Sequence, residues 1–217
     1  MFHQNVRGLL HKSEELVSFL SPDFPQVLSL TEHHLKHSEI DFMCMDQYKL
    51  GAKFCRESLK NGGVSVFVHD TLQCTNINLA VFCKEQDIEA CAVRINLSSL
   101  TICIISIYRS PTGNFLHSLH TLDSILSFLH NNTIEIIICG DFNINYLNDN
   151  DKKSKLDNLL LSYTLYSTVN FPTRIHNNSV MAVDNIFIDK VKYENYSIHP
   201  LVYRLSDDDA QIITVHM

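Results

Sequence analysis

The stretch Ile134-Glu135-Ile136-Ile137-Ile138-Cys139-Gly140-Asp141-Phe142-Asn143 decides the fold. Its run of β-branched apolar residues predicts a buried strand, and the glycine with the polar residues after it predicts a sharp turn at the strand's end. Such a strand would hold Asp141 and Asn143 at a sheet edge, where a carboxylate and an amide can converge on a divalent metal with a phosphate. The alternative is a turn in which both side chains bond their own backbone.

Composition favours one large domain inside the cell. The chain has 217 residues, is 45% hydrophobic and carries seven cysteines without a CxxC pair, as is typical of a reduced core. We expect a single domain over residues 1–217 that is slightly truncated at both ends. No signal peptide or membrane span is predicted, so we expect an intracellular protein without a membrane partner. The formal charge of −7 argues against a broad nucleic-acid footprint but leaves room for a local one.

Strands and helices alternate along the chain. A helix is predicted over 9–20, because its apolar residues fall on one face and Pro22 and Pro25 end it. Asn114 would cap a second helix over 115–129, and a third is expected over 154–162. Strands are predicted over 2–6, 27–31, 48–55, 64–68, 88–95, 101–108, 134–139, 183–188 and 211–215, with a hairpin around Asn61-Gly62-Gly63. More strands than helices, with hairpins among crossovers, predict two mixed sheets covered by helices.

Polar side chains gather where these strands begin or end. They are Asn5, Glu32, Tyr108, Arg109, Asp141, Asn143, Asp184, Asn185 and the segment 206–209. Strand ends commonly hold active-site groups, because the strand fixes them while the loop exposes them. Carboxylate and amide oxygens are hard ligands suited to Mg²⁺ or Mn²⁺, and no Cys/His set has zinc spacing. The sequence therefore predicts a site for a metal and a phosphate.

Seven short segments follow one another along nearly the whole chain. They are His3-Gln4-Asn5-Val6-Arg7-Gly8-Leu9, Leu30-Thr31-Glu32, Ile107-Tyr108-Arg109-Ser110-Pro111, Cys139-Gly140-Asp141-Phe142-Asn143, Phe171-Pro172-Thr173-Arg174, Val183-Asp184-Asn185-Ile186-Phe187 and Leu205-Ser206-Asp207-Asp208-Asp209-Ala210-Gln211. In this order they resemble the endonuclease/exonuclease/phosphatase superfamily, specifically the apurinic-type endonuclease domain of non-LTR retrotransposons. The resemblance implies an α/β fold, a four-layered sandwich with two mixed β-sheets flanked by helices.

The resemblance also implies roles for individual residues. Glu32 would hold Mg²⁺ or Mn²⁺, with Asn5 and Asp207 helping to coordinate or orient it. Asp141 would orient or deprotonate the attacking water. Phosphodiester hydrolysis would then proceed by positioning and by neutralisation of the developing charge.

Other matching residues would contact the nucleic acid. The resemblance implies that Asn143 binds a phosphate oxygen and that Tyr108 donates to the phosphate or to the leaving oxygen. Arg109, Thr173 and Arg174 would contact phosphate or the DNA backbone. DNA is thus the expected partner, and the nucleus the expected compartment if that DNA is genomic, otherwise the cytoplasm.

One position departs from the family pattern. The family's last motif is Ser-Asp-His, and this chain has Asp208 where the histidine belongs. In the family that histidine contacts the scissile phosphate, and a carboxylate, here Asp184, holds its ring. We therefore expect an anion where the phosphate should lie, and two carboxylates close enough to share a proton. Loss of a group that acts on the transition state costs about 10²-fold or more, so we expect impaired activity.

Three function classes remain open. The first is a metal-dependent phosphodiesterase that nicks DNA, impaired at position 208. The second is a catalytically inactive remnant that binds nucleic acid or a protein through the old site. The third is a phosphoesterase acting on another substrate, since the superfamily includes lipid phosphatases, sphingomyelinases and deadenylases.

Histidines offer two further alternatives. His33, His34 and His37 could place two imidazoles together for zinc, but no third ligand is evident, and a solvated helix start is the simpler interpretation. His199 or His216 could replace the missing histidine in space, although surface positions are the simpler interpretation for both.

Overall fold

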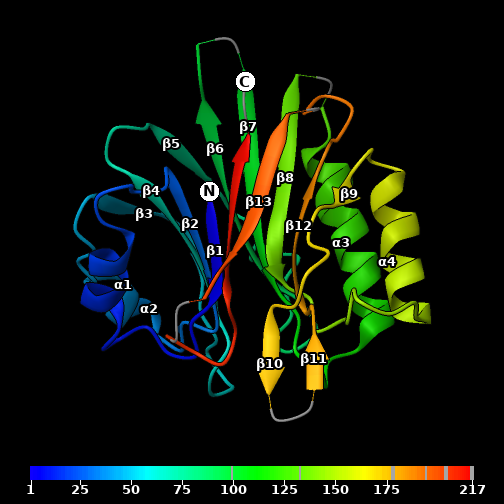
Figure 1. Ribbon diagram of the computed structural model, residues 1–217, viewed down its shortest axis with the longest axis horizontal. Helices are drawn as coiled ribbons and strands as arrows, with labels where there is room; N and C mark the ends of the chain where they lie inside the picture. Colours follow the sequence, from blue (N-terminus) through cyan, green and yellow to red (C-terminus); the bar gives the residue numbers. More distant parts are fainter. Residues whose placement is uncertain (99, 132, 177–178, 194, 203–204, 216–217) are drawn as a thin grey trace.

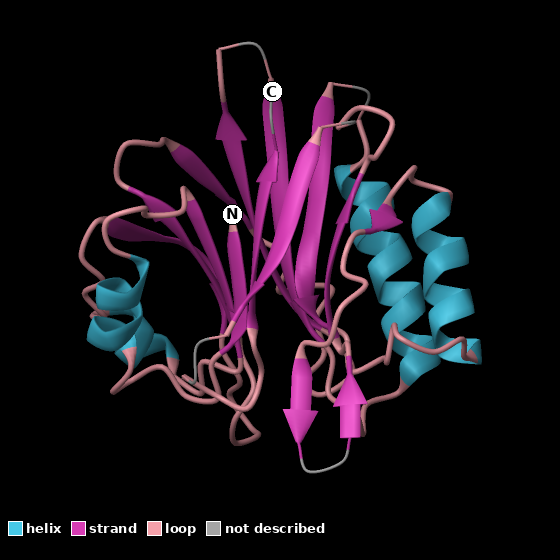
Figure 2. Cartoon of the chain, viewed as in Figure 1, coloured by secondary structure: helices cyan, strands magenta, loops and turns pink. Residues whose placement is uncertain are grey.

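The computed structural model describes residues 1–98, 100–131, 133–176, 179–193, 195–202 and 205–215. Two six-stranded sheets pack face to face, with helices on both outer faces (Figures 1 and 2). The helices are α1 (Ser13–Leu20) and α2 (His37–Asp41) on one side, and α3 (Phe115–Leu129) and α4 (Asp151–Leu161) on the other. The expected four-layered sandwich is confirmed.

Each sheet is mixed and has one parallel pair. The first sheet has the order β13 (Tyr196–Leu201), β14 (Ala210–Val215), β1 (Phe2–Asn5), β2 (Val27–Thr31), β4 (Val64–His69) and β3 (Tyr48–Phe54). The second has the order β5 (Cys74–Ile77), β6 (Glu89–Asn96), β7 (Thr101–Tyr108), β8 (Ile134–Asp141), β12 (Asp184–Ile188) and β9 (Tyr166–Ser167). β1 runs parallel to β2, and β7 parallel to β8; the other pairs are antiparallel. A separate hairpin joins β10 (Arg174–His176) to β11 (Ser179–Met181).

Side chains that alternate between the two faces of β7 and β8 contribute to two separate hydrophobic cores. On β7, Cys103, Ile105 and Ile107 pack beneath α3 and α4, while Ile102 and Ile104 pack against the other sheet. Successive side chains of a strand point to opposite faces, so a strand that is apolar at every position must be covered on both sides. A third core lies between the first sheet and helices α1 and α2. This continuous apolar pattern is why the stretch 134–141 forms a central strand.

Two helix starts differ from the sequence prediction. The helix expected from residue 9 begins at Ser13, because the amides of Gly8 and Leu9 donate to carbonyls of the loop after β2, at 2.8 and 3.0 Å. The helix expected from residue 154 begins at Asp151, where the Asn150 side chain accepts from the amide of Lys153 at 2.9 Å. Both starts were therefore predicted wrongly, by a few residues.

All seven cysteines are free thiols, and four of them are buried: Cys55, Cys91, Cys103 and Cys139. Burial raises the pKa of the Cys55 thiol to about 11. These side chains behave as small apolar groups of the core, as the sequence predicted. None of the described helices is long and apolar enough to cross a membrane.

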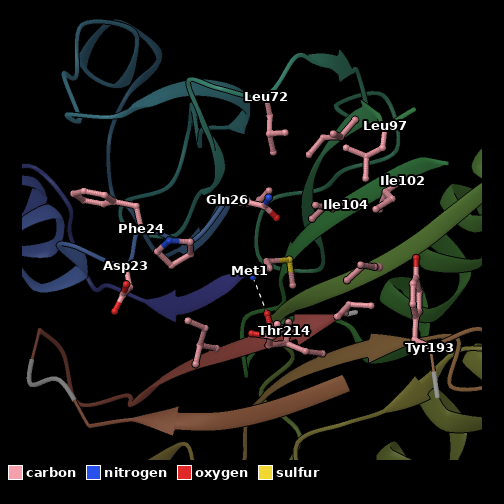
Figure 3. Close-up of a pocket in the computed structure, with 17 residues that line it drawn as sticks. Met1, Asp23, Phe24, Gln26, Leu72, Leu97, Ile102, Ile104, Tyr193 and Thr214 are labelled. Atoms are coloured by element: carbon pink, nitrogen blue, oxygen red, sulfur yellow. Dashed lines mark hydrogen bonds between the residues drawn. The ribbon is translucent and has the colours of Figure 1, made fainter. Parts of the chain in front are cut away.

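The two sheets diverge where β7 begins. There they enclose a cavity of about 390 Å³ lined mainly by aliphatic side chains, including Ile102, Ile104 and Leu97 (Figure 3). The amino group of Met1 borders it and donates to the carbonyl of Ile213 at 2.7 Å (Figure 3). The polar strand ends described below lie at the other end of β7.

We predict that Gly140→Ala destabilises the protein by about 3 kcal/mol or more, because the fold leaves no room for a methyl group there. A Cβ at Gly140 would lie 1.9 Å from the carbonyl oxygen of Ile107, its partner in β7. Urea unfolding measures the loss. Gly8→Ala is the control, since its nearest neighbour would lie 3.5 Å away and only its positive φ of 95° opposes alanine, at about 1 kcal/mol. Equal losses in the two variants would contradict the prediction.

Candidate active site

The ends of both parallel pairs meet in the space between the sheets. Asn5 ends β1, Glu32 follows β2, and Tyr108 and Asp141 end β7 and β8. Tyr108 pairs with Asp141 in the parallel ladder, and Asp184 pairs with Asp141 from the other side. The expected convergence of polar strand ends is thus what the structure shows.

The Asn5 amide joins the two sheets. Its Nδ2 donates to Glu32 Oε1 at 2.8 Å and to Asp141 Oδ2 at 2.9 Å. Its Oδ1 accepts from the amide of Arg7 at 3.2 Å, which fixes the orientation of the side chain. One amide group therefore sets the separation between a carboxylate of the first sheet and a carboxylate of the second.

Glu32 is an ionised carboxylate that stays partly open to solvent. Burial raises its pKa, but hydrogen bonds from His34 and Asn5 outweigh burial and leave the pKa below its usual value. His34 Nε2 lies 3.3 Å from Glu32 Oε2. The backbone of Glu32 is left-handed at a φ of 53°, a strained conformation for a residue with a side chain. The loop thus holds Glu32 in a conformation that it would not adopt alone.

Asp141 is fully buried and accepts from two donors. In addition to Asn5, the backbone amide of Asn143 donates to its Oδ1 at 2.9 Å. Burial raises the pKa of Asp141 well above its ordinary value, as does the nearby Asp184, while Arg174 acts in the opposite direction. The bond from Asn143 is the backbone turn that the sequence allowed as an alternative. This turn does not prevent Asp141 from converging with the other polar side chains, because its second oxygen, Oδ2, accepts from Asn5.

Arg109 supports the loop after β8 from within. Its Nε donates to the carbonyl of Phe142 at 2.7 Å, its Nη2 to the carbonyl of Asn143 at 3.0 Å and its Nη1 to its own neighbour Ser110. The Asn143 side chain returns a bond to the carbonyl of Arg109 at 2.9 Å. The Arg109 side chain is buried and bonded to backbone carbonyls, so it fixes the shape of this loop; its contact with DNA stays a prediction.

Tyr108 lies under a buried ion pair that the sequence did not reveal. The Arg56 guanidinium is centred 5.6 Å from the ring of Tyr108, and its Nε donates to Glu89 Oε1 at 2.6 Å. Burial raises the pKa of Tyr108, and the charges of Glu32 and Asp141 raise it further. The phenol therefore keeps its proton and can donate it in a hydrogen bond.

Asp184 contacts a histidine from the first strand. His3 Nε2 lies 3.2 Å from Asp184 Oδ1, and both side chains are fully buried. Thr173 donates from Oγ1 to Asp184 Oδ2 at 2.9 Å, so Thr173 acts here as a support within the site. Burial lowers the pKa of His3 to about 4, which makes it a neutral imidazole at pH 7. The sequence analysis missed His3, although its alternation with Asn5 along one strand puts both on the same face.

Asp208 is paired with Arg174. Arg174 Nη2 donates to Asp208 Oδ2 at 2.8 Å, and Nε donates to Oδ1. Arg7 Nε lies 3.6 Å from the same carboxylate. The pKa of Asp184 is raised well above its usual value, by burial and then by the charge of Asp208. The side chain of Asp208 thus lies in the site, paired with Arg174 and with Arg7 nearby.

The remaining candidates lie apart from this centre. Asp207 is exposed and forms an ion pair with Arg7. Asn185 accepts from the amides of Ile186 and Val169, at 2.8 and 3.3 Å, within the second sheet. His199 lies exposed on β13, and His216 is outside the described residues.

The three histidines near α2 do not come together. His33 is buried, with Nε2 3.0 Å from the carbonyl of Phe54 and Nδ1 accepting from the amide of Leu35 at 3.0 Å. His34 bonds Glu32, and His37 is exposed. Over the described part of the chain, no group of three or more His, Cys, Asp and Glu side chains is arranged to hold a metal.

We predict that His33 makes the protein less stable as the pH falls from about 6.5 to about 4. Burial lowers its pKa to about 4. Between pH 6.5 and 4, His33 is therefore protonated in the unfolded chain but stays neutral in the folded chain, which favours unfolding. Between pH 7.5 and 4.5 the wild type should lose about 2–3 kcal/mol more than His33→Gln, measured by urea unfolding. The exposed His37→Gln should follow the wild type. Parallel profiles for wild type and His33→Gln would contradict this.

Comparison with known proteins agrees with the geometry. A family model described as "Endonuclease-reverse transcriptase" matches residues 102–207, which begin in β7 and include Tyr108, Asp141, Asn143 and Asp184. No curated protein sequence matches the chain.

Solved structures are similar over the whole chain. The endonuclease domain of TRAS1, a telomere-specific non-LTR retrotransposon, is 13% identical with a TM-score of 0.77, over 100% of this chain and 97% of that one. An AP endonuclease from Archaeoglobus fulgidus is 13% identical with a TM-score of 0.71, over 100% and 98%. TDP2 of D. rerio, complexed with a single-strand DNA product, is 13% identical with a TM-score of 0.66, over 99% and 96%. The chain therefore has the fold of these solved structures, and residues 102–207 match the family model.

Proposed function

We propose that this chain is a metal-dependent phosphodiesterase of the retrotransposon endonuclease type, which hydrolyses one strand of duplex DNA. The observation that carries the proposal is the Asn5 amide, which holds Glu32 and Asp141 together across the two sheets. A purely structural role would not require an ionised Glu32 in a strained backbone beside a buried Asp141. The fold shared with the TRAS1 endonuclease domain supports the same reaction class.

The donor set fits a magnesium or manganese ion held by few protein ligands. Mg²⁺ is commonly bound through one or two carboxylates, with water and substrate phosphate completing its shell. Glu32 supplies an ionised, partly exposed carboxylate, and Asn5 lies beside it. Asp207 could assist only after leaving Arg7. When bound, the ion would supply Lewis-acid stabilisation of the charge that develops on phosphate.

The chain's own residues orient the reacting groups. In our proposal the carboxylate of Asp141, fixed by Asn5 and by the amide of Asn143, accepts a proton from the attacking water. Tyr108 keeps its proton and donates a hydrogen bond to the phosphate or the leaving oxygen. In the same proposal the half-buried Asn143 contacts a phosphate oxygen; its side-chain amide already donates to the carbonyl of Arg109 and has a second N–H to offer.

We expect slow hydrolysis compared with relatives that have histidine at the position of Asp208. The histidine would contact the scissile phosphate, and here Asp208 brings a carboxylate, paired with Arg174, to that position. Loss of a group that acts on the transition state lowers the rate by about 10²-fold or more. In an extreme case the site would only bind DNA or a protein, which is the second candidate function; the Asp208 carboxylate in the site favours that candidate.

The proposal predicts that the chain nicks supercoiled plasmid with Mg²⁺ or Mn²⁺ and stops when EDTA is added. Asp141→Asn and Glu32→Gln should each lower the rate by about 10²-fold or more, because Asp141→Asn removes the proposed proton acceptor and Glu32→Gln the proposed metal ligand. Asp149→Asn is the charge-matched control, since its side chain is 99% exposed on the surface.

Three other outcomes would each be informative. Plasmid binding without nicking would favour the inactive remnant. Hydrolysis of bis(p-nitrophenyl) phosphate without nicking of DNA would favour a phosphoesterase with a different substrate. Nicking that survives Asp141→Asn would refute the proposed site.

A further inference from the structure

Asp208 and Arg174 form a bidentate ion pair at the centre of the site. Both carboxylate oxygens of Asp208 accept from Arg174, and Asp208 is 0% exposed while the Arg174 side chain is 15% exposed. The backbones of the two residues also pair in an isolated β-bridge, and the amide of Asp209 donates to the carbonyl of Thr173 at 2.7 Å. The pair is therefore fixed by main chain as well as side chain.

The pair leaves one edge of the guanidinium available. Asp208 uses Nε and Nη2, while Nη1 has no hydrogen-bond partner among the described residues. Nη2 also lies 3.8 Å from Asp141 Oδ2, the carboxylate that we assign to the attacking water. A guanidinium held along one edge presents its other donors in a known plane, which suits the bidentate recognition of phosphate.

We infer that Asp208 is a positioning residue that holds Arg174 as the phosphate-binding cation of this site. This inference rests on the proposed function and adds a cause for the unusual residue at position 208. An unpaired arginine has many rotamers, and fixing it beforehand removes the cost of ordering it when phosphate binds. Arg7 lies 3.6 Å from Asp208 but is itself paired with Asp207, so Arg174 is the cation that we assign to phosphate.

The competing interpretation is that Asp208 blocks the site. In that case the carboxylate occupies Arg174 in place of phosphate and suppresses both binding and turnover. The two interpretations predict opposite changes in kcat for Asp208→Asn. If Asp208 positions Arg174, then Asp208→Asn lowers kcat, because one anchoring charge is lost, and leaves KM equal or lower, because a negative charge is removed. If Asp208 blocks the site, the same variant raises kcat.

The experiment compares Asp208→Asn with Asp149→Asn, which makes the same change in charge at a side chain that is 99% exposed. Plasmid nicking should show kcat about 10-fold lower in Asp208→Asn, with KM not raised, and little change in Asp149→Asn. Arg174→Ala should lose about 10²-fold, and millimolar guanidinium should restore part of the rate, as a merely structural arginine would not allow. A higher kcat in Asp208→Asn, or an absence of guanidinium rescue, would overturn the inference.

Folding and the proposed function are tested separately. Arg174→Ala leaves a buried carboxylate unpaired, so the double variant Arg174→Gln/Asp208→Asn, which removes both charges, is measured beside it. Anisotropy of a labelled DNA duplex in EDTA reports phosphate binding without turnover, and the double variant should bind about 10-fold more weakly than wild type.

The pattern of failures then identifies which statement is wrong. Asp141-dependent nicking that is unchanged in the double variant would refute the inference and keep the nuclease. No nicking by any variant, with DNA binding that depends on Arg174, would refute the nuclease and keep Arg174 as the phosphate-binding cation. Unchanged DNA binding in the double variant would overturn the inference in either case.

Discussion

The site depends on one amide group that is shared by two carboxylates. Asn5 Nδ2 can donate two hydrogen bonds, and it gives one to Glu32 and one to Asp141, residues that belong to different sheets. Neither sheet alone can make this contact. The geometry of the site therefore depends on how the two sheets pack, because a shift of one sheet relative to the other would break a buried hydrogen bond of Asn5.

Charge is the second constraint on this space. Asp141, Asp184 and Asp208 are all fully buried, and unpaired carboxylates there would be very costly. Arg174 balances Asp208, but the partner of Asp184 is a neutral imidazole. His3 Nδ1 lies 3.1 Å from both the carbonyl and the hydroxyl of Ser29, and Nε2 lies 3.2 Å from Asp184 Oδ1. Burial and the charge of Asp208 raise the pKa of Asp184, which lowers the cost of placing this carboxyl beside a neutral ring.

Local sequence patterns predicted the fold and much of the site. Strands are recognisable from the periodicity of their apolar residues, and the candidate site residues from their positions at the ends of those strands. Asp141, Glu32 and Asn5 were found this way, and the structure brings them together. The partners of these residues were not predictable in the same way. Arg174 and Asp208 are 34 residues apart, and His3 and Asp184 are 181 apart. The sequence likewise did not reveal that the guanidinium of Arg109 donates its hydrogen bonds to backbone carbonyls.

The pairing of β1 with β14 has a consequence for how the chain folds. Phe2 lies opposite Ile212, so the first strand can pair with one of its two neighbours only after the whole segment between them has been synthesised. Closing so long a loop costs entropy before any contact repays it, which slows folding. Asp208, which pairs with Arg174 in a β-bridge, belongs to the same late part of the sequence. A nascent chain therefore lacks the ion pair of Arg174 with Asp208 until this region has been synthesised.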